Sequence, residues 1–138
     1  MLDLTADAAA ALDERLRAEN IVWLTTVTPD GQPQSSPVWF LWADGEFLIY
    51  AQPRSWKVRN IRTHPQVSLN LNSNAGGGQI ATFEATARVA GDQPPVHQTG
   101  AYLAKYRAGI ASIGTTPEQM AADYSTALRL TPTRVRVY

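Results

Sequence analysis

The chain contains no cysteine among its 138 residues, which excludes disulfides, thiolate catalysis and cysteine-ligated metals. It contains two histidines, His64 and His97, which are far apart in the sequence. No HExxH-like spacing is present, and no Ser/His/Asp set stands out. The sequence therefore predicts no metal site and no catalytic side chain, and it favours a protein that holds a cofactor to do its chemistry.

A net charge of one sign is also missing, because twelve Lys and Arg residues balance twelve Asp and Glu residues. This balance argues against a general nucleic-acid-binding or membrane-surface protein. No apolar run reaches membrane-spanning length. Asp3, Asp7 and Asp13 interrupt the alanine-rich N-terminal stretch, which therefore lacks the hydrophobic core of a signal peptide. We expect a cytoplasmic protein that binds neither nucleic acid nor membrane.

What is present is a series of short β-branched and aromatic runs separated by tight turns such as PDGQ and ADGE. Strands are expected over 21–28, 34–42, 46–51, 66–72, 79–90 and 133–138. Helices are expected over 5–19, capped by Thr5, and near 97–108 and 117–127. About six strands with helices at the ends predict an antiparallel β-barrel of the mainly β (α+β) class. We expect residues 1–138 to form one domain.

The segment AQPRSWKVRNIRTHPQV, residues 51–67, concentrates positive charge in this neutral chain. No carboxylate lies between Glu46 and Glu84 in the sequence. The cations of the segment are Arg54, Lys57, Arg59 and Arg62.

Ser55 is the expected helix N-cap, and the helix that follows must end before Pro65, with Trp56 and Ile61 on its inner face and Val58 as a further candidate for that face. Arg54 and Lys57 then lie at the helix N-terminus, where backbone N–H groups already favour negative charge. A phosphate at this position would be bound by the N–H groups, the Ser55 hydroxyl and both cations. The alternative is a solvated basic face that pairs with carboxylates from elsewhere in the fold.

The expected strand over 34–42 contains Pro37, which restricts it to a sheet edge or a bulge. Free backbone groups beside Val38 and Trp39 would be available to hydrogen-bond the polar edge of a flat heterocycle. The alternative is an ordinary edge proline, with Trp39 and Trp42 as core or interface aromatics.

The stretch IVWLTTVTPDGQPQSSPVWFLWADGEFLIYAQPRSWKVRNIRTHPQVSLNL resembles the split β-barrel flavin-binding superfamily that includes pyridoxamine 5′-phosphate oxidase. It is most similar to the branch that uses the deazaflavin coenzyme F420. The resemblance covers roughly residues 10–90 and the closing strand, and SPVWF and RSWKVRNI carry most of it. It implies a six-stranded antiparallel split barrel of the FMN-binding type, and a homodimer with a cofactor groove at the subunit interface.

The resemblance also implies three sets of cofactor-binding residues. The residues that flank the ring are Ser36, Pro37, Val38 and Trp39. Those that line the ring and the ribityl chain are Tyr50, Ala51 and Gln52. Those that hold the phosphate are Arg54, Ser55 and Lys57, with Asn60 as a weaker candidate.

The function implied is an F420-dependent oxidoreductase that passes a hydride between reduced F420 and a small unsaturated organic substrate. The substrate pocket would have apolar walls from Trp39 and from Tyr102 or Tyr106, and no further substrate residue is assigned within 91–132. FMN is the alternative cofactor, because both cofactors present a phosphate, although the acidic tail of F420 would suit Arg59 or Arg62. The sequence is also compatible with a non-catalytic F420-binding carrier and with a nucleic-acid-binding barrel, although neutral charge disfavours the barrel.

Overall fold

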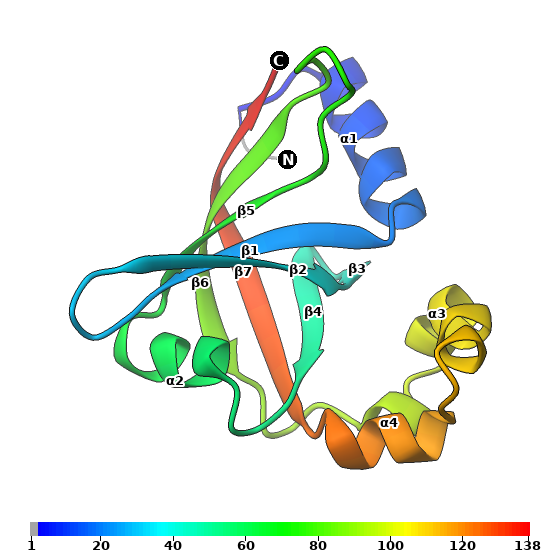
Figure 1. The fold of residues 1–138 in the computed structure, drawn as a ribbon. Helices are drawn as coiled ribbons and strands as arrows, with labels where there is room; N and C mark the ends of the chain where they lie inside the picture. Colours follow the sequence, from blue (N-terminus) through cyan, green and yellow to red (C-terminus); the bar gives the residue numbers. More distant parts are fainter. Residues whose placement is uncertain (1–2) are drawn as a thin grey trace.

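The computed structural model describes residues 3–138, in which seven antiparallel strands form one strongly curled sheet (Figure 1). The strand order is β2-β1-β5-β6-β7-β4-β3, so β2 and β3 are the two edges. The strands are β1 (Ile21–Val27), β2 (Pro33–Trp39), β3 (Leu41–Ala43), β4 (Glu46–Ala51), β5 (Gln66–Asn70), β6 (Ala81–Val89) and β7 (Thr126–Val137). This half-barrel confirms the predicted antiparallel fold class.

The predicted strand over 34–42 is divided at Phe40, which gives seven strands where about six were expected. Before this residue β2 pairs with β1, and after it β3 pairs with β4 at the other edge. The final strand begins at Thr126 instead of 133, because its first half pairs with β4 and also continues the ladder with β6. Pro132 lies in β7 where the β6–β7 register shifts, a position that tolerates a residue without an N–H group.

The helices are α1 (Ala6–Ala18), α2 (Trp56–Thr63), the short 3₁₀ helix η1 (Val96–Gln98), α3 (Gly100–Ser112) and α4 (Pro117–Asp123). Thr5 caps α1 as predicted, since its hydroxyl accepts from the Ala8 N–H group. In Figure 1, α2 and the α3–α4 pair lie on opposite sides of the end of β4. In residues 3–138, no helix is both long enough and apolar enough for a membrane span.

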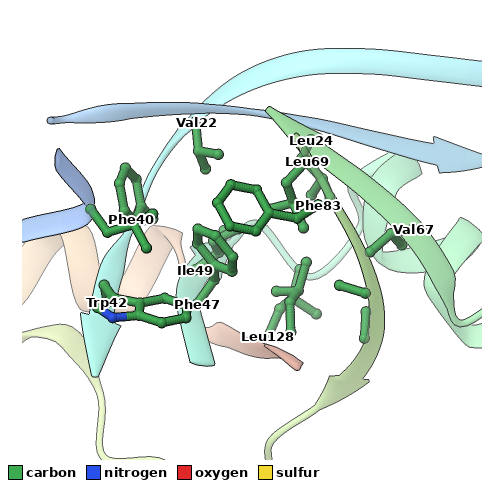
Figure 2. Packing of buried hydrophobic residues seen from close by; sticks show 14 of the residues in the cluster. Val22, Leu24, Phe40, Trp42, Phe47, Ile49, Val67, Leu69, Phe83 and Leu128 are labelled. Atoms are coloured by element: carbon green, nitrogen blue, oxygen red, sulfur yellow. The ribbon is translucent and has the colours of Figure 1, made fainter. Parts of the chain in front are cut away.

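The barrel core is formed by inward-facing side chains that alternate along the strands (Figure 2). Phe47 lies at its centre, with ring centroids 5.6 Å from Phe40, 4.9 Å from Trp42 and 5.1 Å from Phe83. The two phenylalanines Phe47 and Phe83 are at most 1% exposed.

A second apolar cluster lies on the other side of β4, where Leu48 and Tyr50 pack against α3 and α4. Strand β4 is therefore buried on both faces, which explains why EFLIYA is a continuous apolar run instead of an alternating one. Its C-terminal end points toward the start of α2, and this places the candidate site.

Candidate functional site

A cavity of about 290 Å³ opens between edge strand β2, the end of β4, the start of α2 and the α3–α4 pair. Its lining residues are Pro37, Val38, Trp39, Tyr50, Ala51, Gln52, Ser55, Lys57, Tyr102, Ile113, Met120 and Tyr124. The cavity therefore has a polar end, formed by β4 and α2, and an aromatic and aliphatic end, formed by β2, α3 and α4.

Most of the predicted cofactor residues meet in this cavity, although they come from three separate elements. Ser36, Arg54 and Asn60 do not line it. The lining residues that sequence reasoning missed are Ile113, Met120 and Tyr124, all from the 91–132 segment. The spacing of Met120 and Tyr124, four residues apart beside a Thr-Pro helix start, is the signal that could have placed both near one face of a helix.

The polar end is formed around Ser55, which occupies the N-cap of α2 with an extended backbone but makes no side-chain capping bond. The Ser55 Oγ atom is buried and has no hydrogen-bond partner in residues 3–138. Next to it in the cavity lining, Lys57 is half-buried, and this desolvation lowers the pKa of its ammonium group. A buried hydroxyl and a desolvated cation beside free helix N–H groups form a site suited to an anion.

The cations of residues 54–62 are not neutralised by the protein itself in the described residues. The first turn of α2 contains no acidic residue, and Arg54, Arg59 and Arg62 are exposed. The carboxylates that form ion pairs within residues 3–138 are Asp13, Glu19, Glu46 and Glu84, and none of them is paired with a cation of 54–62. The alternative of a basic face paired with carboxylates from elsewhere is therefore not what these residues form.

Asn60 is buried and has a structural connection of its own. Its amide nitrogen donates to Thr26 Oγ1 and to Gln34 Oε1, each at 3.0 Å, and so uses both N–H bonds. These contacts tie α2 to β1 and β2. On the same helix Val58 and Ile61 face the interior, whereas Trp56, predicted to face inward, is 36% exposed beside Lys57, whose Nζ lies 5.0 Å from the indole centroid.

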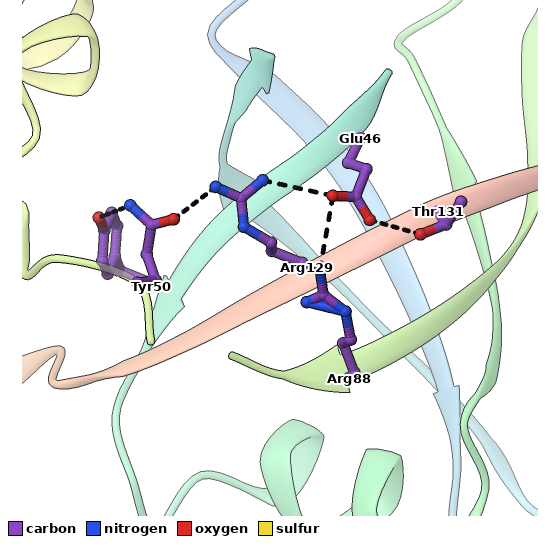
Figure 3. A network of polar contacts seen from close by, with 6 residues as sticks. Glu46, Tyr50, Arg88, Arg129 and Thr131 are labelled. Carbon is purple, nitrogen blue, oxygen red and sulfur yellow. Dashed lines mark hydrogen bonds and ion pairs between the residues drawn. The ribbon is translucent and has the colours of Figure 1, made fainter. Parts of the chain in front are cut away.

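Tyr50 is held in the cavity wall by a polar network that extends across β4 and β7 (Figure 3). Its hydroxyl donates to Pro94 O at 2.7 Å and accepts from Gln93 Nε2 at 3.3 Å. Arg129 connects Gln93 to Glu46, which also accepts from Thr131 and forms an ion pair with Arg88. The network fixes the Tyr50 ring and the segment that leads into α3.

The aromatic end is a series of packed rings. Tyr50 meets Tyr102 edge-on at 5.0 Å, Tyr102 meets Tyr106 at 4.8 Å, and Tyr106 stacks on Trp39 at 4.7 Å with planes 5° apart. Burial raises the pKa of Tyr102 and of Tyr106 well above the usual range, so both hydroxyls stay neutral. Among the residues that line the cavity, Lys57 carries a positive charge, and no lining residue in 3–138 is a carboxylate.

Comparisons with known proteins identify the family and the fold. A family model described as pyridoxamine 5′-phosphate oxidase matches residues 8–138, nearly the whole chain. No curated protein matches the sequence.

Solved structures share the fold at low sequence identity. The conserved hypothetical protein Rv2991 of Mycobacterium tuberculosis is 23% identical, with a TM-score of 0.75 over 96% of this chain and 84% of its own. A protein named F420 reductase is also 23% identical, with a TM-score of 0.69 over 90% of this chain and 94% of its own. HutZ, the heme storage protein of Vibrio cholerae, is 18% identical, with a TM-score of 0.66 over 93% and 92%.

Proposed function

The chain belongs to the pyridoxamine 5′-phosphate oxidase family of split-barrel flavin-binding proteins, and from this membership we propose that it is a coenzyme F420-dependent oxidoreductase. The observation that carries the proposal is the anion site at the start of α2, where the unpartnered Ser55 hydroxyl and the desolvated Lys57 open into a cavity with an aromatic wall. A phosphorylated ring cofactor needs these two environments side by side.

In the proposed complex the phosphate is bound by Ser55, Lys57 and the N–H groups of the first turn of α2, with Arg54 at the rim. Asn60 is left out of the phosphate contacts, because both of its amide N–H bonds are already used. Ala51 and Gln52 follow the ribityl chain. Residues 1–138 are proposed to act as one cofactor-binding domain.

The ring is proposed to lie beside Pro37, Val38 and Trp39, opposite Tyr50. Pro37 belongs to edge strand β2, which has no further strand on its outer side in the described sheet. Ser36 lies on the same edge strand, and its buried hydroxyl has no hydrogen-bond partner in residues 3–138, although Ser36 itself does not line the cavity. The chemistry that the bound deazaflavin supplies is hydride transfer, while the protein aligns the ring and excludes water.

F420 is preferred over FMN because of charge outside the cavity. Arg59 and Arg62 are exposed on α2 without ion-pair partners in residues 3–138, and the acidic tail of F420 offers groups for them, whereas FMN ends at its phosphate. The similarity to the protein named F420 reductase points in the same direction.

The substrate is proposed to be a small, neutral, unsaturated organic molecule. The part of the cavity formed by Tyr102, Ile113, Met120 and Tyr124 offers apolar surface and neutral hydroxyls but no charged group. At about 290 Å³ the cavity is at the small end for a ligand site, which fits a homodimer whose partner completes the walls around cofactor and substrate. We place this dimer in the cytoplasm.

A non-catalytic F420 carrier is the second candidate. It is favoured by the lack of a carboxylate or histidine in the cavity lining, which leaves no general acid among the lining residues apart from Lys57 and weakly acidic tyrosines. HutZ, a heme storage protein, shares the fold, so a storage role has a structural counterpart.

Titration of the purified protein with F420 and, separately, with FMN tests the proposal, with cofactor fluorescence as the signal. We expect saturable binding of F420 that is tighter than that of FMN. Stopped-flow oxidation of the reduced cofactor by 1,4-naphthoquinone and 2-cyclohexenone then distinguishes the roles, because turnover supports an enzyme and tight binding without turnover supports the carrier. Binding of neither cofactor contradicts both candidates.

A further inference from the structure

Trp39, the last residue of β2, lines the cavity. Two residues of α3, Tyr106 and Gly109, lie against its indole but do not line the cavity themselves. Tyr106 lies parallel to the indole at 4.7 Å, and Gly109, one turn further along the helix, faces its outer edge. A Cβ atom added at Gly109 would lie 3.3 Å from Trp39 Cη2 and 3.5 Å from Cζ2. The first of these distances is shorter than an ordinary carbon–carbon contact, so the indole has to give by a few tenths of an ångström to accept a side chain at this position.

Helix α3 cannot easily move back to relieve such a contact, because it is anchored beside Trp39. The Tyr106 hydroxyl accepts from Phe40 N at 2.8 Å and lies within donating distance of Asn20 O at 2.7 Å. Lys105 Nζ donates to Phe40 O, also at 2.8 Å. Phe40 and Tyr106 are buried and Lys105 is half-buried. The backbone at Phe40, directly after the end of β2, is therefore fixed to α3.

We propose that Gly109 is a positioning residue that, through Trp39, sets the shape of the ring-binding part of the cavity, an inference that rests on the proposed cofactor function. Because Gly109 has no side chain, the indole of Trp39 lies back against α3. A Cβ atom at position 109 would press on the Cη2–Cζ2 edge of the indole, and because α3 is anchored and Tyr106 covers one face of the ring, Trp39 has to shift by a few tenths of an ångström within the cavity wall. The shape of the ring-binding part then changes, while the phosphate-binding end at Ser55 and Lys57, at the start of α2, is unchanged.

The test compares Gly109→Ala and Gly109→Val with Gly100→Ala, a matched control on the same helix where an added Cβ has nothing within 4 Å. We expect Gly109→Ala to weaken F420 binding by roughly 5-fold, the lower end of the cost of overpacking, because the indole has to give by only a few tenths of an ångström, and Gly109→Val to weaken it further. Gly100→Ala should bind F420 as the wild type does. The rise in melting temperature produced by inorganic phosphate should be the same in all four proteins.

The melting temperature of each ligand-free variant shows whether the substitution also affects folding, because the better helix propensity of alanine opposes the cost of overpacking against Trp39. Wild-type F420 affinity in Gly109→Ala overturns the inference and leaves the proposed function standing. A parallel loss of the phosphate effect in Gly109→Ala also overturns it, because the damage would then reach the phosphate end. A wild type that binds neither F420 nor FMN contradicts the proposed function and, with it, the inference.

Discussion

At the scale of single residues, Ser55 has the most informative position. It is the N-cap of α2 yet caps nothing with its side chain, and its buried hydroxyl has no partner in residues 3–138. A buried polar atom without a hydrogen bond destabilises the folded protein. A ligand that supplies the missing partner would remove this cost at Ser55.

The first prediction therefore concerns Ser55→Ala, which should affect stability and binding in opposite directions. The free energy of unfolding of the free protein should stay the same or rise, because a desolvated hydroxyl is removed and no capping bond is lost. F420 affinity should fall by roughly 10-fold or more, the cost of one charge-assisted hydrogen bond. Urea unfolding and fluorescence titration measure the two quantities. A loss of stability with unchanged affinity would show that Ser55 is an ordinary helix cap.

Lys105 gives a prediction about pH. Burial lowers its pKa to about 8, although its Nζ donates to Phe40 O and lies 3.9 Å from the centroid of the Phe40 ring. An unfolded lysine has a pKa near 10.4, so between about pH 8 and 10 the unfolded chain binds more protons than the folded one. The contribution of Lys105 to the free energy of unfolding should therefore rise with pH in this window.

Lys105→Met keeps the apolar stem and removes the titrating group. The difference in the free energy of unfolding between wild type and Lys105→Met should shift in favour of the wild type from pH 8 to pH 10, and it should be constant between pH 6 and 7. Denaturant unfolding at each pH measures this difference. A difference that does not change with pH would mean that Lys105 is solvated in the folded protein.

At the scale of elements, α2 was predictable because its signals are local. Pro53 stops β4, Ser55 begins the helix and Pro65 ends it, and each acts within a few residues. The division of the 34–42 strand was not predictable, because Phe40 gives its backbone groups to Tyr106 and Lys105, more than sixty residues away. A contact so distant leaves no mark on local periodicity.

The candidate site divides in the same way between local and distant signals. The residues of β2, β4 and the start of α2 were predictable, because they follow one another in a stretch that resembles a known family. Ile113, Met120 and Tyr124 enter the cavity only because α3 and α4 pack on the outer face of β4. The prediction that Trp56 lies on the inner face of α2 was wrong. Asn60, a polar residue, occupies a buried position on that helix.

The role of Asn60 as the connection between α2 and the barrel gives the third prediction. Asn60→Ala leaves Thr26 Oγ1 and Gln34 Oε1 without their donor and should lower the free energy of unfolding by about 1–3 kcal/mol. Adding Thr26→Val should recover part of that loss, because both members of one buried pair are then apolar. Urea unfolding of the single and double variants measures this effect. An additive further loss in the double variant would contradict the assigned pairing.

At the scale of the whole molecule, stability and binding are located in different places. The barrel core is closed around Phe47 and Phe83, whereas the cavity lies outside it, between β4 and the α3–α4 pair. Phe83→Ala should lower the free energy of unfolding by about 3–5 kcal/mol, the usual cost of emptying a fully buried phenylalanine site. Below its lowered melting temperature, as followed by circular dichroism, the variant should bind F420 with near wild-type affinity. A selective loss of affinity in the folded variant would show that core and site are coupled.

The distribution of charge is the other property of the whole molecule. The chain is neutral overall, and its ion pairs place carboxylates on α1, at the C-cap of α1, on β4 and on β6, while the cations of 54–62 stay without such partners in the described residues. The account depends on the conclusion that this uncompensated charge binds a phosphate at the start of α2.

The most direct test is the affinity of wild type and Lys57→Ala for two ligands: F420, and the same deazaflavin riboside without phosphate and tail. Arg107→Ala, which removes an exposed cation of α3, controls for net charge. We predict that Lys57→Ala loses roughly 10- to 150-fold in affinity for F420, the cost of one charge-assisted contact, and changes little for the riboside. Arg107→Ala should bind both ligands as the wild type does. Equal losses for the two ligands, or no loss for F420, would contradict a phosphate site at Lys57.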